Sequence, residues 1–229
     1  MEEIVTLFHI GPLAISMTVV STWGLMAVLG ILFAISTARL KVRNPGKGQV
    51  VLESIVAAIE SAIADMMPDR PRLLVPFVGT LWVFLACANL IGLIPELHSP
   101  TGDLSLTAAL AVLVFCSVHW FGIRSDGLLS YLRHYMAPSP IMVPFHIVSE
   151  FSRTIALAVR LFGNIASLEM AALLVLIVAG FLVPVPILVL HVIEALVQAY
   201  IFGMLSLVYI AGGIQSQQQT QEKKEEGKT

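Results

Sequence analysis

Charged residues are scarce in this chain of 229 amino acids. Asp, Glu, Lys and Arg together make up 12% of it, against about 25% in a typical soluble domain. Hydrophobic residues make up 57%, and the mean hydropathy is +0.89. Several apolar runs approach or exceed the roughly 20 residues that a helix needs to cross a bilayer. The composition therefore excludes a soluble domain and predicts an integral membrane protein.

Other absences narrow the class of membrane protein. The two cysteines, Cys87 and Cys116, both fall inside apolar runs, so they are interpreted as small core residues rather than a disulfide or metal pair. Segments of alternating polar and apolar residues are missing, which argues against an outer-membrane barrel. No repeat of fixed period is evident, so an inverted-repeat transporter is not supported. The acidic start Met1–Glu3 is unlike a secretory signal, and the first apolar run is expected in the mature protein.

The apolar runs predict an all-α integral membrane protein with about five membrane-embedded helices. The expected spans cover residues 13–37, 73–94, 104–122, 141–182 and 187–212. The fourth run is too long to cross a bilayer upright, so it must tilt, kink near Gly163, or both. It is expected to form a hairpin with the last helix.

One further helix, 49–67, is interrupted by Glu53, Glu60 and Asp65 at helical spacing. It is predicted to be amphipathic and to lie along the cytoplasmic surface. Residues 1–214 then form a single membrane domain. The tail 215–229, rich in glutamine, lysine and glutamate, is predicted to be disordered.

The basic residues predict the orientation of the chain. Eleven of the 13 lie between Arg39 and Arg72, in the connector 123–140, or in the tail. The positive-inside rule places these segments in the cytoplasm. The N-terminus is then outside and the C-terminus inside, as five crossings require.

Arg160 is the most informative residue, because long apolar segments flank it on both sides. A charge at that depth costs about 2.5–3.5 kcal/mol on insertion scales, so it should face protein or water and serve a function. Asn164 lies one helical turn away on the same face, whereas Glu169 is turned to the opposite face. No acid on this stripe lies within one turn, since Glu150 is ten residues away. The carboxylate on which Arg160 acts is therefore expected on another subunit.

More polar groups share this depth in the last two predicted helices. His191, Glu194 and Gln198 lie on one helix face, since they are spaced by three and four residues. A single buried polar residue usually tethers two helices, but a face of titratable groups indicates a proton relay or ion path. Asn89 fits either role, and His119 at a span end is interpreted as an interface anchor. The candidate path residues besides Arg160 are Asn164, Glu169, His191 and Gln198, with His146, Ser149, Glu150, Glu194 and Asn89 as further lining.

The run Arg160–Leu161–Phe162–Gly163–Asn164, with Glu169 after it, resembles the signature of subunit a of the F-type ATP synthase. The resemblance extends to Gln198–Ala199–Tyr200–Ile201–Phe202 and to Asn89–Leu90–Ile91–Gly92–Leu93–Ile94–Pro95, and so covers the chain from about residue 70 onward. It implies a non-catalytic subunit that provides two half-channels and an essential arginine for transfer of protons, or of sodium, to and from a rotating ring. The half-channel entered from outside would use Glu169, His191, Gln198 and Asn164.

The same resemblance implies the setting of the protein. The partners would be the ring of c subunits, the b stalk and the rest of the complex, within membrane lipid and without nucleic acid. No cofactor or metal is expected, and the membrane is expected to be the bacterial inner membrane. The chain departs from the family pattern at His146, where a glutamate is common, at Thr154, where many relatives have proline, and in carrying both His191 and Glu194. These departures leave the cytoplasmic exit and the transported ion open.

Two other functions remain as alternatives. A stand-alone cation or proton channel or transporter would need a complete ion path of its own. A membrane metalloenzyme could use His146 and Glu150 with His191 and Glu194, but Arg153 lies one turn from the first pair and would repel a dication.

Overall fold

The computed structural model describes residues 6–10, 13–38, 40–41, 45–68, 71–94, 99–127, 131, 143–179 and 184–226. Five helices within these ranges are long and apolar enough to cross a membrane: α1 (Met17–Ala38), α3 (Pro71–Ile91), α4 (Leu104–Asp126), α6 (Val143–Ala179) and α7 (Pro184–Glu226). The prediction of an all-α integral membrane fold is confirmed. Most of the predicted connector 123–140 lies outside the described residues. So do residues 95–98, between the second and third expected spans, and residue 183, between the last two.

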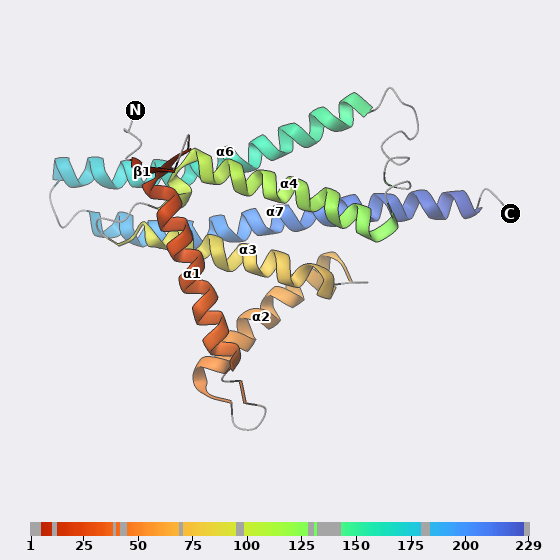
Figure 1. Ribbon diagram of the computed structural model, residues 1–229, viewed down its shortest axis with the longest axis horizontal. Helices are drawn as coiled ribbons and strands as arrows, with labels where there is room; N and C mark the ends of the chain where they lie inside the picture. Colours follow the sequence, from red (N-terminus) through yellow and green to blue (C-terminus); the bar gives the residue numbers. More distant parts are fainter. Residues whose placement is uncertain are drawn as a thin grey trace.

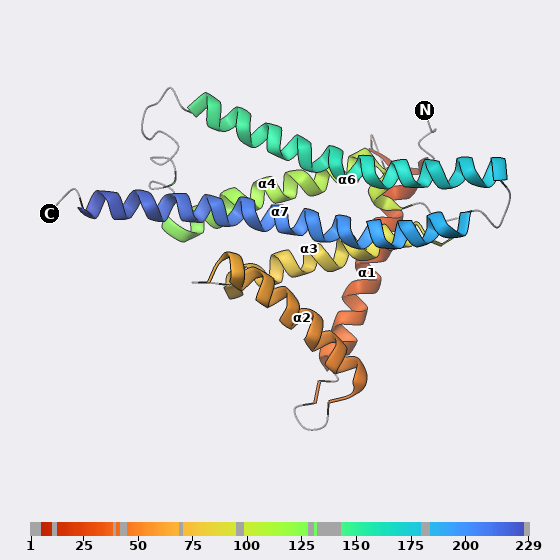
Figure 2. The same cartoon turned by 180° about the vertical axis from the view of Figure 1, so that it is seen from behind.

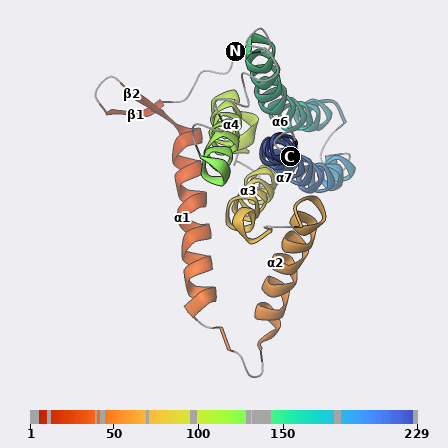
Figure 3. The same cartoon turned by 90° about the vertical axis from the view of Figure 1, so that its right-hand side faces the viewer.

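Helices α3, α4, α6 and α7 lie side by side along the long axis of the molecule (Figures 1 and 2). Helix α1 leaves one end of this bundle at a steep angle, and α2 (Lys47–Met66) returns toward it, so that the two form a V (Figure 3). Helix α6 is continuous but bends about midway (Figure 1). Helix α1 buries only Thr22 and Leu25, and a helix that exposes apolar residues on nearly every side suits a lipid environment.

The first described residues form two short paired strands, which differ from the predicted first span. Strand β1 (Thr6–Ile10) pairs antiparallel with β2 (Leu13–Ser16), and Ile10 lies opposite Leu13. The helix therefore starts at Met17 rather than near Leu13, because the backbone of the preceding four residues is paired with β1. Periodicity could not separate the two elements, since a short apolar strand and the start of an apolar helix look alike in sequence.

The far end of the chain also differs from the prediction. Helix α7 continues to Glu226, through most of the segment 215–229 that the sequence predicts to be disordered. Gln, Lys and Glu all have good helix propensity, and a helix already formed extends at little cost because only its nucleus is expensive.

The core of the bundle is built from all four of its helices. Leu81 and Leu85 of α3, Val114 of α4, Leu161 of α6 and Phe202 of α7 belong to one buried cluster. A second cluster joins α2, α3 and α7 around Ile63 and Leu74, Val78, Leu207, Ile210 and Ile214. Lipid tails are as apolar as these side chains, so close packing rather than escape from water holds membrane helices together.

A short 3₁₀ helix, η1 (Pro100–Gly102), leads from α3 into α4. Asp103 caps α4, because its carboxylate accepts a hydrogen bond of 2.8 Å from the Ser105 amide. Burial opposes ionisation of Asp103, but hydrogen bonds from Ser105 and Thr18 outweigh it and lower the pKa of this carboxyl. The junction is thereby fixed against both α4 and α1.

Helices α3 and α7 are in tight contact at Gly203. The Trp82 indole lies where a Cβ of residue 203 would stand, and it donates a hydrogen bond of 3.2 Å from Nε1 to the Tyr200 carbonyl. The same ring stacks on Tyr200, with the two planes 12° apart. Only glycine leaves room for this arrangement.

Replacing Gly203 tests whether this contact determines the packing of α3 on α7. Gly203→Ala is expected to destabilise the subunit by about 1–3 kcal/mol or more, because the methyl group and the indole would occupy one space. The measurement is thermal inactivation of the purified complex, together with the amount of subunit retained in membranes. Gly212→Ala, in the same helix with no atom within 4 Å of its Cβ position, is the matched control and should behave like wild type. Equal behaviour of the two variants would contradict this account.

Candidate functional site

Arg160 faces outward from the bundle. Leu157, Leu161 and Ile165 recur every four residues on α6 and pack into the bundle, with Leu161 and Ile165 fully buried. Their burial fixes the rotation of the helix and leaves Arg160 on the exposed side. No carboxylate in the described ranges lies within ion-pair distance of its guanidinium. The positive charge of Arg160 is therefore exposed on the outer side of the bundle.

One turn beyond Arg160, a side-chain hydrogen bond joins α6 to α7. Asn164 Nδ2 donates to Gln198 Oε1 over 2.7 Å, and Gln198 is 1% exposed. The Gln198 Nε2 donor has no hydrogen-bond partner among the described residues. Buried donors are rarely left in that state, so this amide pair offers a hydrogen-bonding group next to the arginine.

Asn89 links α3 to α7 and is itself fully buried. Its Nδ2 donates to the Ala195 carbonyl over 3.1 Å. The backbone carbonyl oxygen of Asn89 lies 3.3 Å from the ring Nε2 of His191. A carbonyl can only accept, so in this contact Nε2 carries the hydrogen. Asn89 thus tethers two helices and also positions a titratable ring.

Glu169 lies on the other side of α6 from Arg160, against η1. Its Oε1 accepts a hydrogen bond of 2.9 Å from the Ser99 amide. Two glycines make the space for the carboxylate, since a Cβ at Gly92 would lie 2.9 Å from Oε1 and one at Gly102 would lie 3.0 Å from Oε2. These contacts are tighter than ordinary packing allows.

Ser99 and Thr101 connect the two groups just described. The hydroxyl oxygens of Ser99 and Thr101 are 2.6 Å apart, and Thr101 Oγ1 donates to Asn89 Oδ1 over 2.7 Å. A buried polar network therefore runs from Glu169 through Ser99, Thr101 and Asn89 to His191, and it joins α6, η1, α3 and α7. The sequence patterns did not point to either hydroxyl, because both lie between the expected spans 73–94 and 104–122, in a short polar connection. Their signal is weak, since Ser, Thr, Pro and Gly are also what an ordinary turn contains.

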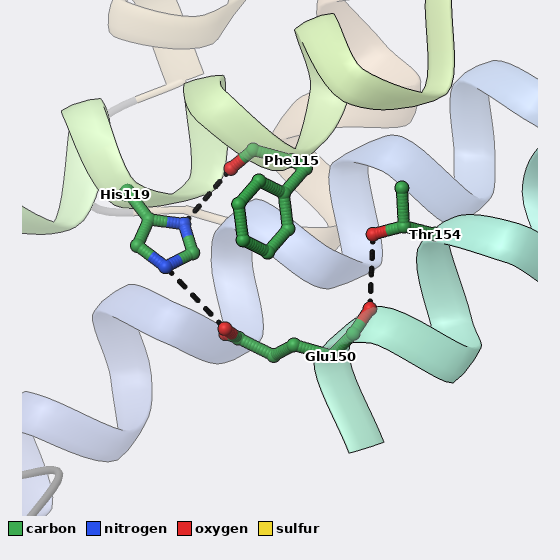
Figure 4. A network of polar contacts seen from close by, with 4 residues as sticks. All are labelled: Phe115, His119, Glu150 and Thr154. Carbon is green, nitrogen blue, oxygen red and sulfur yellow. Dashed lines mark hydrogen bonds and ion pairs between the residues drawn. The ribbon is translucent and has the colours of Figure 1, made fainter. Parts of the chain in front are cut away.

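A second polar group lies near the opposite end of α6 (Figure 4). The ring Nε2 of His119, on α4, is 3.3 Å from Oε2 of Glu150, on α6. The other ring nitrogen, Nδ1, is 2.9 Å from the Phe115 carbonyl. Thr154 Oγ1 donates to the backbone carbonyl of Glu150 over 2.9 Å. The structure thus brings His119, which the sequence suggested as an interface anchor, into contact with a candidate path residue.

Other candidates are placed less specifically. His146 and Ser149 are exposed on α6. Glu194 is half-buried and makes no polar contact with the described part of the chain. His146, Glu150, His191 and Glu194, the set that a metalloenzyme would need, do not gather: within the ranges searched no three His, Cys, Asp or Glu residues could hold a metal ion.

Five apolar helices with polar side chains buried between them define a multi-pass membrane protein. Comparison with known proteins specifies which kind. The family model described as ATP synthase A chain matches residues 19–211, and the chain belongs to this family.

Individual relatives agree over nearly the whole length. An ATP synthase subunit a 2 of Pelobacter propionicus is 58% identical over 226 residues, 99% of each chain. An ATP synthase subunit a 1 of Hahella chejuensis is 61% identical over 207 residues, 90% of this chain and 88% of its own. An ATP synthase subunit a of Legionella pneumophila is 54% identical over 209 residues, 91% of each. The resemblance found in the sequence is confirmed.

The role of the buried hydroxyls can be tested at Thr101. Thr101→Val keeps the shape but leaves Asn89 Oδ1 without this donor in a fully buried place, at an expected cost of about 1–3 kcal/mol. Thr101→Ser keeps the hydroxyl and should lose less. The comparison is made by thermal inactivation of the purified complex and by hydrogen exchange across residues 99–103. If valine is tolerated as well as serine, the hydroxyl network does not hold this region together.

Proposed function

We propose that this chain is the stationary ion-channel subunit of an F-type ATP synthase. In this role Arg160 acts on the carboxylates of a rotating ring of c subunits, and two half-channels lead ions to and from that ring. The single observation that carries the proposal is the outward position of Arg160 without an acidic partner in the described chain. Membership of the ATP synthase A chain family supports it.

The chemistry of arginine limits what Arg160 can do. Its guanidinium stays protonated in proteins, so it cannot itself pass a proton. It can favour the ionised form of a carboxylate within about 4–6 Å and lower that group's pKa. A ring carboxylate that reaches Arg160 would thus be driven to release its ion. Arg160 also repels a second cation, which prevents a direct leak between the half-channels.

The half-channel entered from outside is assigned to the network around Glu169 and His191, with Asn164 and Gln198 at its inner end. Glu169 is the titratable group nearest the C-terminal end of α6, and His191 is held against Asn89. The Asn164–Gln198 pair lies one turn from Arg160, where an arriving ion would meet a ring carboxylate. The ion neutralises that carboxylate, which can then enter lipid as the ring turns.

The second half-channel is assigned to the N-terminal part of α6, with His146, Ser149 and Glu150. Along the helix, Glu150 lies about 15 Å from Arg160, and Glu169 lies about 14 Å from it on the other side. Each charge that crosses the membrane releases about 2.3 kcal/mol per 100 mV, so several crossings are needed for one ATP. The exposed sides of α6 and α7 would form the surface against the ring.

The proposed setting is an ATP synthase complex in a bacterial membrane. The chain has no catalytic role of its own, and ATP is made elsewhere in the complex, to which the b stalk also belongs. The membrane is the bacterial inner membrane, with the N-terminus outside and the C-terminus in the cytoplasm. The positive-inside distribution of the basic residues supports this orientation. The transported ion is a proton or sodium.

Arg160→Ala and Arg160→Lys test the central assignment in membranes that contain the whole complex. Both are expected to lose ion-driven ATP synthesis, because the fixed charge is absent in one and displaced in the other. ATP hydrolysis by the detached soluble head should be unchanged. Arg72→Ala is the control for loss of a positive charge: its partner is Glu60 at 3.6 Å in an exposed pair, which contributes little. Wild-type synthesis in Arg160→Ala would refute the proposal.

A further inference from the structure

We propose that His119 and Glu150 share one proton and act as the proton-transferring pair of the half-channel at the N-terminal end of α6. This inference rests on the proposed function, and it adds a residue on α4 to a path otherwise assigned to α6. The observation behind it is the contact between the two side chains across the α4–α6 interface (Figure 4).

The hydrogen bonds of the ring limit its protonation. The Phe115 carbonyl can only accept, so Nδ1 of His119 carries a hydrogen in the 2.9 Å contact between them. The 3.3 Å contact from Nε2 to Glu150 Oε2 then requires one hydrogen between these two atoms. That hydrogen belongs either to an imidazolium facing a carboxylate or to a carboxylic acid facing a neutral ring. In both cases the pair holds one exchangeable proton beyond the one fixed on Nδ1.

The location suits a relay. The two side chains are 30% and 22% exposed, so both remain partly accessible at the surface of the chain. A cavity of about 20 Å³ lies beside Glu150, lined also by Arg153, Thr154 and Tyr209, and this is room for about one water molecule. Glu150 and Glu169 are 19 residues apart, about 28 Å along α6. Titratable groups thus stand near both ends of this helix, with Arg160 between them.

Other titratable and charged groups surround the pair. The Tyr131 ring lies 5.8 Å from that of His119. The Arg153 guanidinium is 4.6 Å from the centre of the Tyr209 ring, so it is held near the cavity by α7. His146 is one turn before Glu150 on α6. Arg124, five residues after His119 on α4, is turned about 140° away.

The proposed step is a proton transfer without net change. During ATP synthesis, a proton released by a ring carboxylate reaches the pair through water and binds to it, which gives an imidazolium beside a carboxylic acid. A proton leaves the pair to the aqueous side, and the pair returns to holding one. The fixed Nδ1–H keeps the ring oriented throughout, because its acceptor is a backbone carbonyl of the same helix.

Removal of either titratable group should slow ion flow. In membranes containing the whole complex, His119→Gln and Glu150→Gln are expected to lower ATP-driven proton pumping about a hundredfold, at the low end of the range for positioned acid–base groups. The dependence of pumping on pH should also flatten, which loss of packing alone would not produce. Trp120→Phe is the matched control, since this neighbouring ring is 64% exposed and should leave pumping at the wild-type level.

Two further variants separate a proton-sharing pair from a structural contact. The double variant His119→Gln with Glu150→Gln should be no slower than either single variant, because groups that act as one unit are not additive. The exchanged variant, His119→Glu with Glu150→His, should recover pumping because it still holds one proton between a carboxyl and a ring. If the single variants fail to assemble, the exchanged variant decides: recovery supports the pair, and assembly without pumping overturns it.

Failure of the His119–Glu150 inference can be distinguished from failure of the proposed function. If both single variants pump like wild type with an unchanged pH profile while Arg160→Ala abolishes synthesis, the His119–Glu150 inference is wrong and the proposed function stands. If Arg160→Ala retains synthesis, the proposed function itself fails.

Discussion

The organisation of this protein depends on how one helix is rotated. Leu157, Leu161 and Ile165 bury one side of α6 in the bundle, and that choice directs Arg160 outward while Glu169 faces η1. A charge at membrane depth is costly unless protein or water surrounds it, so a rotation that exposes it agrees with the proposed ring carboxylate as its partner. The same apolar contacts that stabilise the bundle therefore also determine where the cation stands.

Packing between α3 and α7 determines the positions of the buried polar residues Asn89 and His191. These antiparallel helices are in tight contact where Trp82 meets Gly203 and Tyr200. About two turns along, the same register brings Asn89 opposite Ala195 and His191. The buried polar network is compatible with a stable fold only because nearly all of its groups are paired. An unpaired polar group in the interior costs about 1–3 kcal/mol. The tight packing at Trp82 and Gly203 thus also fixes the hydrogen-bond geometry at Asn89, two turns away.

Sequence patterns predicted the elements of the bundle well, because membrane helices must satisfy their backbone internally and are long and apolar. They also singled out Arg160, Asn164 and Gln198 as candidates, since a polar residue within an apolar run is conspicuous. They missed Ser99 and Thr101, whose burial depends on η1 folding back between α3 and α6. They did not pair His119 with Glu150, because no spacing within one helix reveals a partner on another. Contacts between distant segments were beyond the reach of periodicity, and the strand at 13–16 was hidden in an apolar run.

The two glycines beside Glu169 set the size of the side chain that fits at this position, but not its charge. Space for the side chain exists only because Gly92 and Gly102 lack a Cβ, and this space is blind to charge: a glutamine would fill it equally well. The Ser99 amide, which donates to Oε1, could donate in the same way to the side-chain oxygen of a glutamine. The fold therefore specifies the length of the residue at 169, whereas its capacity to ionise is left entirely to the identity of one terminal atom. Selection on folding and selection on ion transfer can act on this position independently.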